Sequence, residues 1–284
     1  MFKRHFILFF LICASVFYFL NTTWINLPDG QLHFFALNVG QGNASLIITP
    51  TGQKILIDGG PENAVLEELG AILPFYDRQL DLIILTHPHA DHLSGFIPIL
   101  DRFQVKAILA TGNVAKNATY EIFWQKISAQ KIPIYLAHAK HDFNLGGNVF
   151  LDVVYPEKIE AGKIFNNDNN SSLISRVVYK NSEILFPGDA EDSEEKELLK
   201  TSFLLTADVL QVPHHGSRTS SIPEFLNQIK SDWFVISAGK DNSYGHPHTE
   251  TLAKFPPEKT LRTDLKGRIH LMTNGDGKWL LLHS

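Results

Sequence analysis

The stretch that decides the fold is Asp81-Leu82-Ile83-Ile84-Leu85-Thr86-His87-Pro88-His89-Ala90-Asp91-His92-Leu93-Ser94-Gly95. It begins with an apolar run bounded by Asp81 and Thr86, which is typical of a buried β-strand. Three histidines and one carboxylate follow this strand within six residues. Residues of these types at this density indicate a metal site at the carboxyl end of the strand.

The spacing of the ligands predicts two metal positions. His87 precedes a proline, which favours an extended backbone, so His87 and His89 can point to the same side and hold one ion. Asp91 and His92 come where the chain turns into a helix near Leu93, and they can face a second ion. Imidazole and carboxylate groups together suit Zn²⁺, with Mn²⁺ or iron as alternatives. A polar loop with chance histidines is the competing interpretation in a chain that holds 13 of them.

A further carboxylate follows another apolar strand. Asp189 comes directly after residues 185–188, which end in a proline and a glycine. A carboxylate at a strand end can bridge two metal ions. The alternative is an ordinary helix N-cap, because Asp is a favoured capping residue. The upstream histidine cluster favours the ligand role.

Two adjacent histidines follow the apolar strand at residues 208–212. We expect one of them to complete the metal site and the other to contact substrate or donate a proton. We favour His214 as the ligand, because it directly follows the rigid strand end, and His215 as the catalytic residue. The exchange of these two roles stays open, and two surface histidines near a helix start are the alternative. His246, held between a glycine and a proline, suits a positioned catalytic or ligand residue, or else a turn that leads into a helix.

The predicted secondary structure alternates in both halves of the chain. The expected helices are 62–73, 93–102, 120–130, 193–200 and 222–230, and residues 144–148 are expected to form a turn. The expected strands are 31–38, 44–49, 54–58, 81–86, 106–109, 134–136, 149–155, 172–179, 184–187, 208–212, 233–237, 267–273 and 278–283. Each half runs from antiparallel strands into strand–helix alternation. This order predicts a mixed α/β (α+β) fold, a four-layer αββα sandwich of two sheets with helices on the outer faces.

The N-terminus predicts one hydrophobic helix ahead of this sandwich. Three basic residues at 3–5 precede fifteen uncharged residues, 6–20, a pattern typical of a secretory signal. Small residues for cleavage do not follow, so we expect residues 1–25 to be an uncleaved signal-anchor rather than a signal peptide. Residues 26–284 would then form the extracytoplasmic domain of a protein that crosses the inner membrane once. If the signal is cleaved instead, they would form a secreted or periplasmic protein. A buried helix of a soluble domain is the alternative.

Composition narrows the function only slightly. The chain has 284 residues, 44% of them hydrophobic, which is enough for one large domain with a full core. Its net charge of −5 provides no global basic field, which counts mildly against a simple nuclease, although a local groove can still be basic. Cys13 is the only cysteine. The chain therefore forms no intrachain disulfide and offers no thiolate to the metal site.

The histidine cluster resembles the signature of the metallo-β-lactamase superfamily, in which the four residues His87, His89, Asp91 and His92 would bind one or two metal ions. Residues 38–44, 168–172, 212–217 and 244–247 narrow the resemblance to the stand-alone form of the metallo-hydrolase domain of ComEC-like competence proteins. The resemblance covers roughly residues 31–283. It implies no DNA transport by this chain alone, because those proteins pass DNA through a polytopic channel and this sequence has one hydrophobic segment.

One ligand of the superfamily is missing from this chain. A histidine is common where this sequence has Asp168-Asn169-Asn170-Ser171-Ser172. The resemblance therefore implies that Asp168 or an asparagine amide such as that of Asn170 replaces it, or that water fills the position. A turn rich in Asn and Ser is the alternative.

These observations predict a metal-dependent hydrolase with one or two ions. A metal-bound water has a pKa of about 7 and supplies hydroxide. Asp91 would hold a metal or orient this nucleophile, and His215 or His246 would protonate the leaving group or stabilise developing charge. The competence resemblance favours phosphodiester bonds, with DNA and the membrane as partners and a nuclease linked to DNA uptake. The alternatives are a small ester or amide (phosphocholine ester, lactone, β-lactam) and a non-catalytic metal-binding subunit of an uptake complex.

Overall fold

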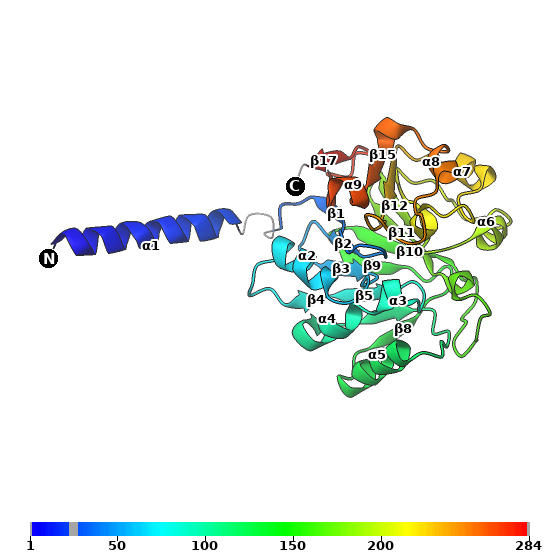
Figure 1. Cartoon of the computed structure of the whole chain (residues 1–284), viewed down its shortest axis with the longest axis horizontal. Helices are drawn as coiled ribbons and strands as arrows, with labels where there is room; N and C mark the ends of the chain where they lie inside the picture. The colour runs from blue at the N-terminus through cyan, green and yellow to red at the C-terminus, as the bar shows by residue number, and fades with distance from the viewer. Residues whose placement is uncertain (1, 23–27, 283–284) are drawn as a thin grey trace.

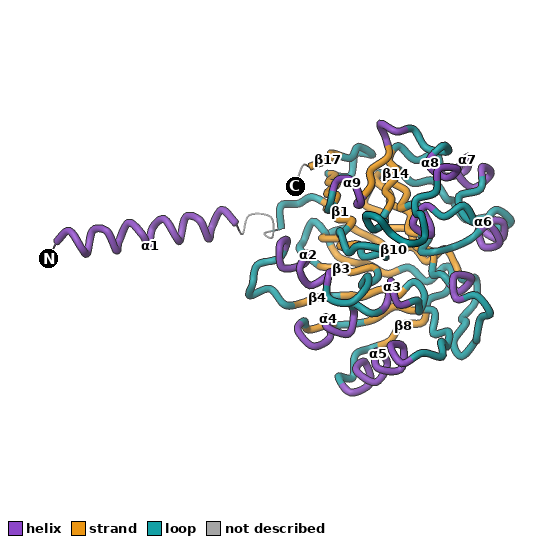
Figure 2. The backbone as a smooth tube through the Cα atoms, viewed as in Figure 1, coloured by secondary structure: helices purple, strands orange, loops and turns teal. Residues whose placement is uncertain are grey.

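The computed structural model describes residues 2–22 and 28–282, which contain two β-sheets packed face to face. Helices cover the outer face of each sheet (Figures 1 and 2). In spatial order, the eight-stranded sheet contains β17 (Leu280–Leu282), β16 (Ile269–Thr273), β1 (Leu32–Ala36), β2 (Ser45–Ile48), β3 (Lys54–Ile57), β5 (Leu82–Leu85), β7 (Ile108–Ala110) and β8 (Ile134–Leu136). The seven-stranded sheet contains β15 (Thr260–Arg262), β14 (Trp233–Ile236), β13 (Val209–Gln211), β12 (Ser182–Phe186), β11 (Ile174–Tyr179), β10 (Val149–Tyr155) and β9 (Phe143–Gly146). This architecture confirms the predicted αββα sandwich.

The helices divide between the two sheets. The outer side of the eight-stranded sheet carries α2 (Ala64–Ile72), α3 (Ala90–Leu93), α4 (Phe96–Arg102) and α5 (Ala118–Ala129). The seven-stranded sheet carries α6 (Asp192–Leu198), α7 (Pro223–Ile229) and α8 (Thr249–Leu252). The remaining elements are α9 (Thr263–Lys266), the 3₁₀ turns η2 (Asp168–Ser171), η3 (Pro213–Gly216) and η4 (Pro257–Lys259), and a two-stranded sheet of β4 (Gln79–Leu80) and β6 (Gln104–Val105).

Separate buried clusters fill the spaces between these layers. The inner cluster takes apolar side chains from both sheets, and the ring of Phe34 on β1 meets that of Phe186 on β12 edge to face at 5.5 Å. A second cluster joins the eight-stranded sheet to α2–α5, and a third joins the seven-stranded sheet to α6 and α7. Strands such as β5 are apolar along their whole length because both of their faces are buried.

The expected helix 93–102 is two helices, α3 and α4, and the first begins at Ala90. Gly95 lies between them, and its backbone N–H donates to the carbonyl oxygen of Gly60 at 2.8 Å. A Cβ atom at Gly95 would lie 1.9 Å from the carbonyl oxygen of Gly59. Glycine is therefore required where this loop meets the end of β3, and the close contact fixes the position of Asp91 and His92 in α3.

Several short elements were not predicted. The expected turn 144–148 is correct only at residues 147 and 148, because β9 occupies residues 143–146 and pairs with β10. The pair β4 and β6, strand β15 and helix α9 were also missed, because segments of two to four residues carry too little periodicity. Helix α8 begins where the alternative interpretation of His246 expected a turn to lead into a helix. The expected strand 278–283 corresponds to β17, and residue 283 lies outside the described residues.

The predicted N-terminal helix is present as α1 (Phe2–Thr22) and extends away from the sandwich in Figure 1. Its described side chains, at residues 5–16 and 18, are exposed. In the part of the chain that the structure describes, no helix has the length and apolar character needed to cross a membrane. The predicted single-pass membrane anchor is therefore wrong, and the localisation that depended on it falls with it.

The physical reason lies in the length of the apolar run. Its fifteen residues cover about 22 Å as a helix, less than the roughly 30 Å hydrocarbon core of a bilayer. Residues 1 and 23–25 of the predicted 1–25 segment lie outside the described residues. The boundary at residue 26 therefore stays a prediction.

Candidate metal centre

The candidate centre lies where parallel strands of both sheets end. Strand β5 runs parallel to β3, and β13 runs parallel to β12 and β14. Parallel strands place their carboxyl ends at the same edge of a sheet, so the segments that follow them gather there. His87 follows β5, Asp189 follows β12 and His215 follows β13.

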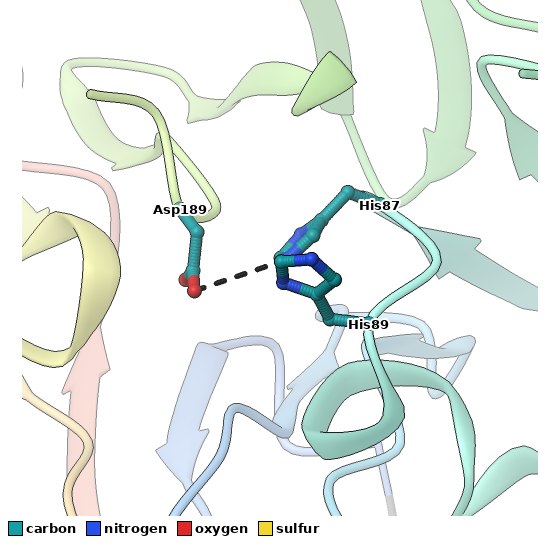
Figure 3. A group of neighbouring side chains, drawn as sticks. All are labelled: His87, His89 and Asp189. Atoms are coloured by element: carbon teal, nitrogen blue, oxygen red, sulfur yellow. Dashed lines mark ion pairs between the residues drawn. The ribbon is translucent and has the colours of Figure 1, made fainter. Parts of the chain in front are cut away.

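The first ligand cluster contains His87, His89 and Asp189 (Figure 3). One ligand atom from each residue lies within 4.8 Å of the other two. The Nε2 atom of His87 is 3.8 Å from Oδ2 of Asp189, and the two histidine rings are 4.7 Å apart. His87 and Asp189 are buried, while His89 is partly exposed. Because the histidines and the carboxylate come from different sheets, this cluster exists only in the packed sandwich.

The second ligand cluster contains Asp91, His92 and His215, again within 4.8 Å of one another. The Nε2 atom of His215 is 3.2 Å from Oδ2 of Asp91 and 3.5 Å from Oδ2 of Asp189. The Nε2 atom of His92 is 3.2 Å from Oδ1 of Asp189. The carboxylate of Asp189, a member of the first cluster, therefore also faces the second. Its role as a bridge between two ions stays a prediction.

The ligand atoms fit a divalent cation because their ordinary hydrogen bonds are missing. Among the described residues, four buried atoms of the two clusters have no hydrogen-bond partner: Nε2 of His87, His92 and His215, and Oδ1 of Asp189. His92 and Asp189 are close, but their atoms are not aligned as a hydrogen bond. Each unpaired buried polar atom costs about 1–3 kcal/mol. Imidazole nitrogens and carboxylate oxygens that converge in this way form a donor set typical of a divalent metal site.

Outer partners aim these imidazoles at the centre. Nδ1 of His92 is 2.8 Å from Oδ2 of Asp58, and Nδ1 of His215 is 3.0 Å from the carbonyl oxygen of Ser237. Thr86 donates its hydroxyl to Asp58 at 2.8 Å, which leaves its oxygen free to accept from Nδ1 of His87 at 3.1 Å. With the protons on Nδ1, the Nε2 lone pairs of all three rings face the clusters. Such partners are usual for histidine ligands.

Asp58 was not among the predicted site residues. It is buried, and it also accepts from the backbone N–H of Thr86 at 2.9 Å. The signal in the sequence was a charged residue before two glycines at the end of an apolar strand. A buried carboxylate at such a place needs partners, and here they are Thr86 and His92.

The electrostatics of the centre favour positive charge. Burial opposes ionisation of Asp189, but His92 and His215 outweigh it and hold the pKa of Asp189 well below its ordinary value. Burial likewise opposes protonation of His92, but Asp189 and Asp58 hold its pKa well above the ordinary value. Burial, together with the charge of His92, lowers the pKa of His87 well below its ordinary value. The ionised carboxylates thus draw cationic charge into the site, carried by imidazolium protons or by a metal.

The structure separates the two adjacent histidines. His215 is buried in the second cluster, whereas His214 is partly exposed, with Nε2 3.9 Å from Oδ2 of Asp189 and Nδ1 3.4 Å from Oε1 of Glu191. The sequence favoured His214 as the ligand and left the exchange open. This geometry favours the exchange, because it turns His215 into the cluster and leaves His214 beside it.

His246 is positioned next to the second cluster. Its ring centre lies 5.5 Å from that of His214 and 6.0 Å from that of His215. The side chain of Asn242 bonds both backbone polar groups of His246: its Oδ1 accepts from the N–H, and its Nδ2 donates to the carbonyl oxygen. Burial and the neighbouring histidines lower the pKa of His246 to about 4. A neutral imidazole is thus fixed beside the centre.

The segment expected to replace the missing histidine reaches the centre only at its end. Leu173 donates its backbone N–H to the carbonyl oxygen of Thr86, and Ser172 accepts from the N–H of Asp189. Asp168 belongs to neither cluster; its charge adds to the effect of burial in raising the pKa of Tyr120. Asn170 has a buried, unpartnered Oδ1 atom. Its role as the substitute ligand stays a prediction.

Comparison with known proteins places this geometry in a family. The model of the "Metallo-beta-lactamase superfamily" matches residues 37–240. The chain belongs to this superfamily. As a superfamily member it is a metal-dependent hydrolase, with His/Asp clusters that imply a divalent metal. The family predicted from the histidine cluster is therefore confirmed.

Curated relatives narrow the comparison for this superfamily member. It is 28% identical to "ComE operon protein 3" of Bacillus subtilis over 91% of this chain and 35% of the relative. It is also 28% identical to "Recombination protein 2" of Haemophilus influenzae over 92% of this chain and 31% of the relative, and to "Competence protein ComA" of Neisseria gonorrhoeae over 85% and 32%. The chain spans about a third of the length of these relatives. The predicted resemblance to competence proteins is confirmed over that part.

Solved structures support the fold. The metallo-beta-lactamase fold protein YhfI from Bacillus subtilis superposes with a TM-score of 0.52 at 14% identity, over 81% of this chain and 95% of that one. A diphosphatase of the PhnP family gives a TM-score of 0.51 at 15% identity, over 89% of this chain and all of that one. At these identities the likeness concerns the arrangement of the layers alone.

Proposed function

We propose that this superfamily member hydrolyses phosphodiester bonds of DNA with two divalent ions, Zn²⁺ in the first instance. The observation that carries the proposal is the position of Asp189. Its carboxylate lies within 4 Å of Nε2 atoms from both ligand clusters, at 3.8 Å from His87 and 3.2 Å from His92. A carboxylate shared by two ligand sets suits two neighbouring metal ions, and phosphatases and nucleases are among the enzymes that use such a pair.

The relatives support DNA as the substrate class. Two relatives whose names refer to recombination and competence match 92% and 85% of the chain. Competence and recombination both concern DNA, and a hydrolase that acts on DNA cleaves phosphodiesters. The role of the chain would then be DNA processing linked to uptake.

The side chains of this chain divide the chemical work. Two bound metal ions would supply an activated water and neutralise charge on the phosphoryl oxygens. Asp91, within 3.2 Å of His215, holds its cluster together and can accept a hydrogen bond from the nucleophile. Both His214 and His246 lie beside the clusters and belong to neither. We assign His246 to the leaving group, to which its ring N–H would donate, because Asn242 fixes its backbone. Asn242 keeps the imidazole in place while the bond breaks.

The test uses the full chain, loaded with Zn²⁺ or Mn²⁺ and analysed for metal. Single-stranded DNA, bis-p-nitrophenyl phosphate and the β-lactam nitrocefin are assayed in parallel. The Asp189→Ala variant is the negative control, and Asp192→Ala, an exposed acid three residues further on, is the matched control. Cleavage of both phosphodiesters by the wild type and by Asp192→Ala, lost in Asp189→Ala, is expected.

Two results would contradict the proposal. Turnover of nitrocefin without cleavage of either phosphodiester would move the function to small esters or amides. Full metal occupancy without activity on any substrate would favour a metal-binding subunit that does not catalyse.

A further inference from the structure

Two loops beside the metal centre are fastened to each other. The backbone N–H of His248 donates to the carbonyl oxygen of Gly216 at 3.0 Å, and Thr251 donates its hydroxyl to the carbonyl oxygen of Ser217 at 2.9 Å. A Cβ atom at Gly216 would lie 2.6 Å from Cβ of Pro247. The segment after His215 and the segment after His246 therefore form one rigid rim.

A pair of hydrogen-bond donors meets in this rim. The backbone N–H of Arg218 donates to Nδ1 of His248 at 3.1 Å, so that nitrogen is the acceptor. A neutral imidazole that accepts at Nδ1 carries its proton on Nε2. Yet Nε2 of His248 lies 3.1 Å from Nη2 of the Arg218 guanidinium, which only donates. Two N–H groups thus face each other, and neither can accept from the other.

An anion would satisfy both donors. Arg218 is exposed, and within the described residues it forms no ion pair with a carboxylate. Its planar guanidinium matches the oxygens of a phosphate group, and charge-assisted hydrogen bonds of this kind are roughly twice as strong as neutral ones. Because the two nitrogens are only 3.1 Å apart, such an oxygen would lie in front of both and not between them. The geometry favours a phosphate oxygen that accepts from Nη2 of Arg218 and Nε2 of His248 together.

The donor pair lies one side chain away from the catalytic groups. The ring of His248 is 4.8 Å from that of His246, which in turn contacts the rings of His214 and His215. A phosphate bound there is therefore a neighbour of the scissile group and not the scissile group itself. The ring of Tyr244 also stacks on that of His246, with ring centres 5.8 Å apart, and Tyr244 is 66% exposed. An exposed aromatic face of this kind can stack on an unpaired base.

We propose that Arg218 and His248 bind the phosphate that flanks the scissile bond of a single-stranded nucleic acid, with Tyr244 as the stacking surface for a base. This inference rests on the proposed function, because it names the substrate form that the same centre takes. A single strand fits better than a duplex, since a base must leave its stack to reach Tyr244.

The experiment compares two substrates in the metal-loaded full chain. Bis-p-nitrophenyl phosphate has one phosphodiester and no flanking phosphate, whereas a fluorescein-labelled single-stranded oligonucleotide has many. The variants are Arg218→Ala, Arg218→Lys and Tyr244→Ala. The matched control is Arg102→Ala, which removes an exposed arginine from α4 on the other sheet. The readouts are kcat/KM for each substrate and the salt dependence of oligonucleotide affinity.

The ratio of kcat/KM for the oligonucleotide to that for the small phosphodiester is expected to fall about tenfold in Arg218→Ala. The slope of log affinity against log salt should become shallower by about 0.7, the value for one lost single-strand phosphate contact. Arg218→Lys should leave the salt slope unchanged, because the charge is kept, and should lower the kcat/KM ratio less than Arg218→Ala does. Tyr244→Ala weakens oligonucleotide binding about tenfold with an unchanged slope, and Arg102→Ala changes neither readout.

Equal losses on both substrates in Arg218→Ala, or an unchanged salt slope, would overturn the inference. A wild type that cleaves neither phosphodiester would mean that the proposed function has failed. Oligonucleotide binding, measured by fluorescence anisotropy, would then test the inference separately. Equal affinity of the wild type and Arg218→Ala would overturn it, and a tenfold weaker variant with the shallower slope would support it.

Discussion

The eight-stranded sheet supplies its ligands from one continuous segment, residues 87–92, whereas the seven-stranded sheet supplies Asp189 and His215 from two separate loops. The first segment has ordinary backbone geometry, with His89 extended at φ −69° before the helix α3. The second region does not. His214 and His215 both have positive φ, at 50° and 54°, inside η3.

This difference shows two ways to place a ligand. In the first region a strand followed by a helix turn places the ligands with ordinary backbone geometry, and outer partners such as Asp58 only orient the rings. In the second region each left-handed residue costs about 1–2 kcal/mol, so surrounding contacts must hold it. The backbone N–H of His214 donates to the carbonyl oxygen of Gly188, and Nδ1 of His215 donates to that of Ser237. The predictions that follow test whether the two regions really differ in this way.

The largest expected effect is on the residue that joins the regions. Asp189→Ala should lose both metal ions. Loss of an outer partner of a ligand lowers activity by up to about a hundredfold, so loss of this shared ligand should lower it by more than that. His89→Ala should lose one ion and keep the other, because it belongs to the first cluster alone. Metal content by mass spectrometry decides between them. Equal stoichiometry in the two variants would mean that the clusters do not share Asp189.

A second variant pair separates the adjacent histidines. His215→Ala should lose the ion of the second cluster, because its Nε2 lies 3.2 Å from Asp91. His214→Ala should retain metal, since its ring contacts Glu191 and Thr219 outside the clusters. Calorimetric Zn²⁺ titration of both proteins provides the comparison. Loss of an ion in His214→Ala but not in His215→Ala would restore the ligand assignment that the sequence favoured.

The third prediction concerns the support of the strained region. Glu195, buried on α6, accepts from the backbone N–H groups of Ser221 and Ile222 at 2.6 and 2.8 Å. Burial raises the pKa of Glu195 from 4.5 to about 7. Between about pH 4.5 and pH 7 the native state keeps a proton on Glu195 that the unfolded chain has released. The free energy of unfolding is therefore highest below about pH 4.5 and falls by about 3 kcal/mol as the pH rises to about 7.

Glu195→Gln removes this titration. Urea unfolding of the wild type and the variant between pH 4.5 and pH 8 should show a difference in the free energy of unfolding that changes by about 3 kcal/mol. Glu224→Gln, at an exposed position on α7, is the control. Parallel pH profiles of the wild type and Glu195→Gln would rule out this role for Glu195.

A smaller effect is expected in the first region. Asp58→Asn keeps the volume of the side chain but weakens the acceptor for Nδ1 of His92. Loss of an outer partner lowers metal affinity by about 10–100-fold. Competition with a fluorescent zinc chelator measures the change. An affinity within about threefold of the wild type would show that α3 alone orients His92.

The smallest effect compares the two backbones directly. His214→Gly should stabilise the metal-free protein by about 1 kcal/mol, because glycine has no penalty at positive φ. Ala90→Gly, in the helix α3 of the first region, should destabilise it by roughly 0.5–1 kcal/mol. Thermal unfolding with a chelator present gives both values. Changes of the same sign would remove the contrast between the regions.

Much of the fold could be predicted because its signals are local. Apolar runs such as that of β5 identify buried strands, and the order of strands and helices predicts the sandwich. The prediction that α1 spans a membrane was wrong, because its apolar run of fifteen residues is too short to cross a bilayer. Local signals also missed β4 and β6, whose pairing depends on the strands being brought together from residues 79 and 104.

The candidate site divides in the same way. The cluster at residues 87–92 is recognisable because its ligands are adjacent in sequence. Asp58 was missed because its role depends on a buried hydrogen bond to His92 across the loop. The choice between His214 and His215 also lay beyond the sequence, since the side chains of adjacent residues point apart and only the packed rim decides which one faces the carboxylates.

By itself, the sequence determined the superfamily, the four layers and the ligand types, because strand periodicity and ligand spacing act over a few residues. The tertiary structure alone decided that Asp189 faces both clusters and that Arg218 and His248 meet as two donors. These placements depend on the packing of two sheets and on the left-handed turn at η3. The free energy that maintains them comes from contacts between residues that are far apart in the chain.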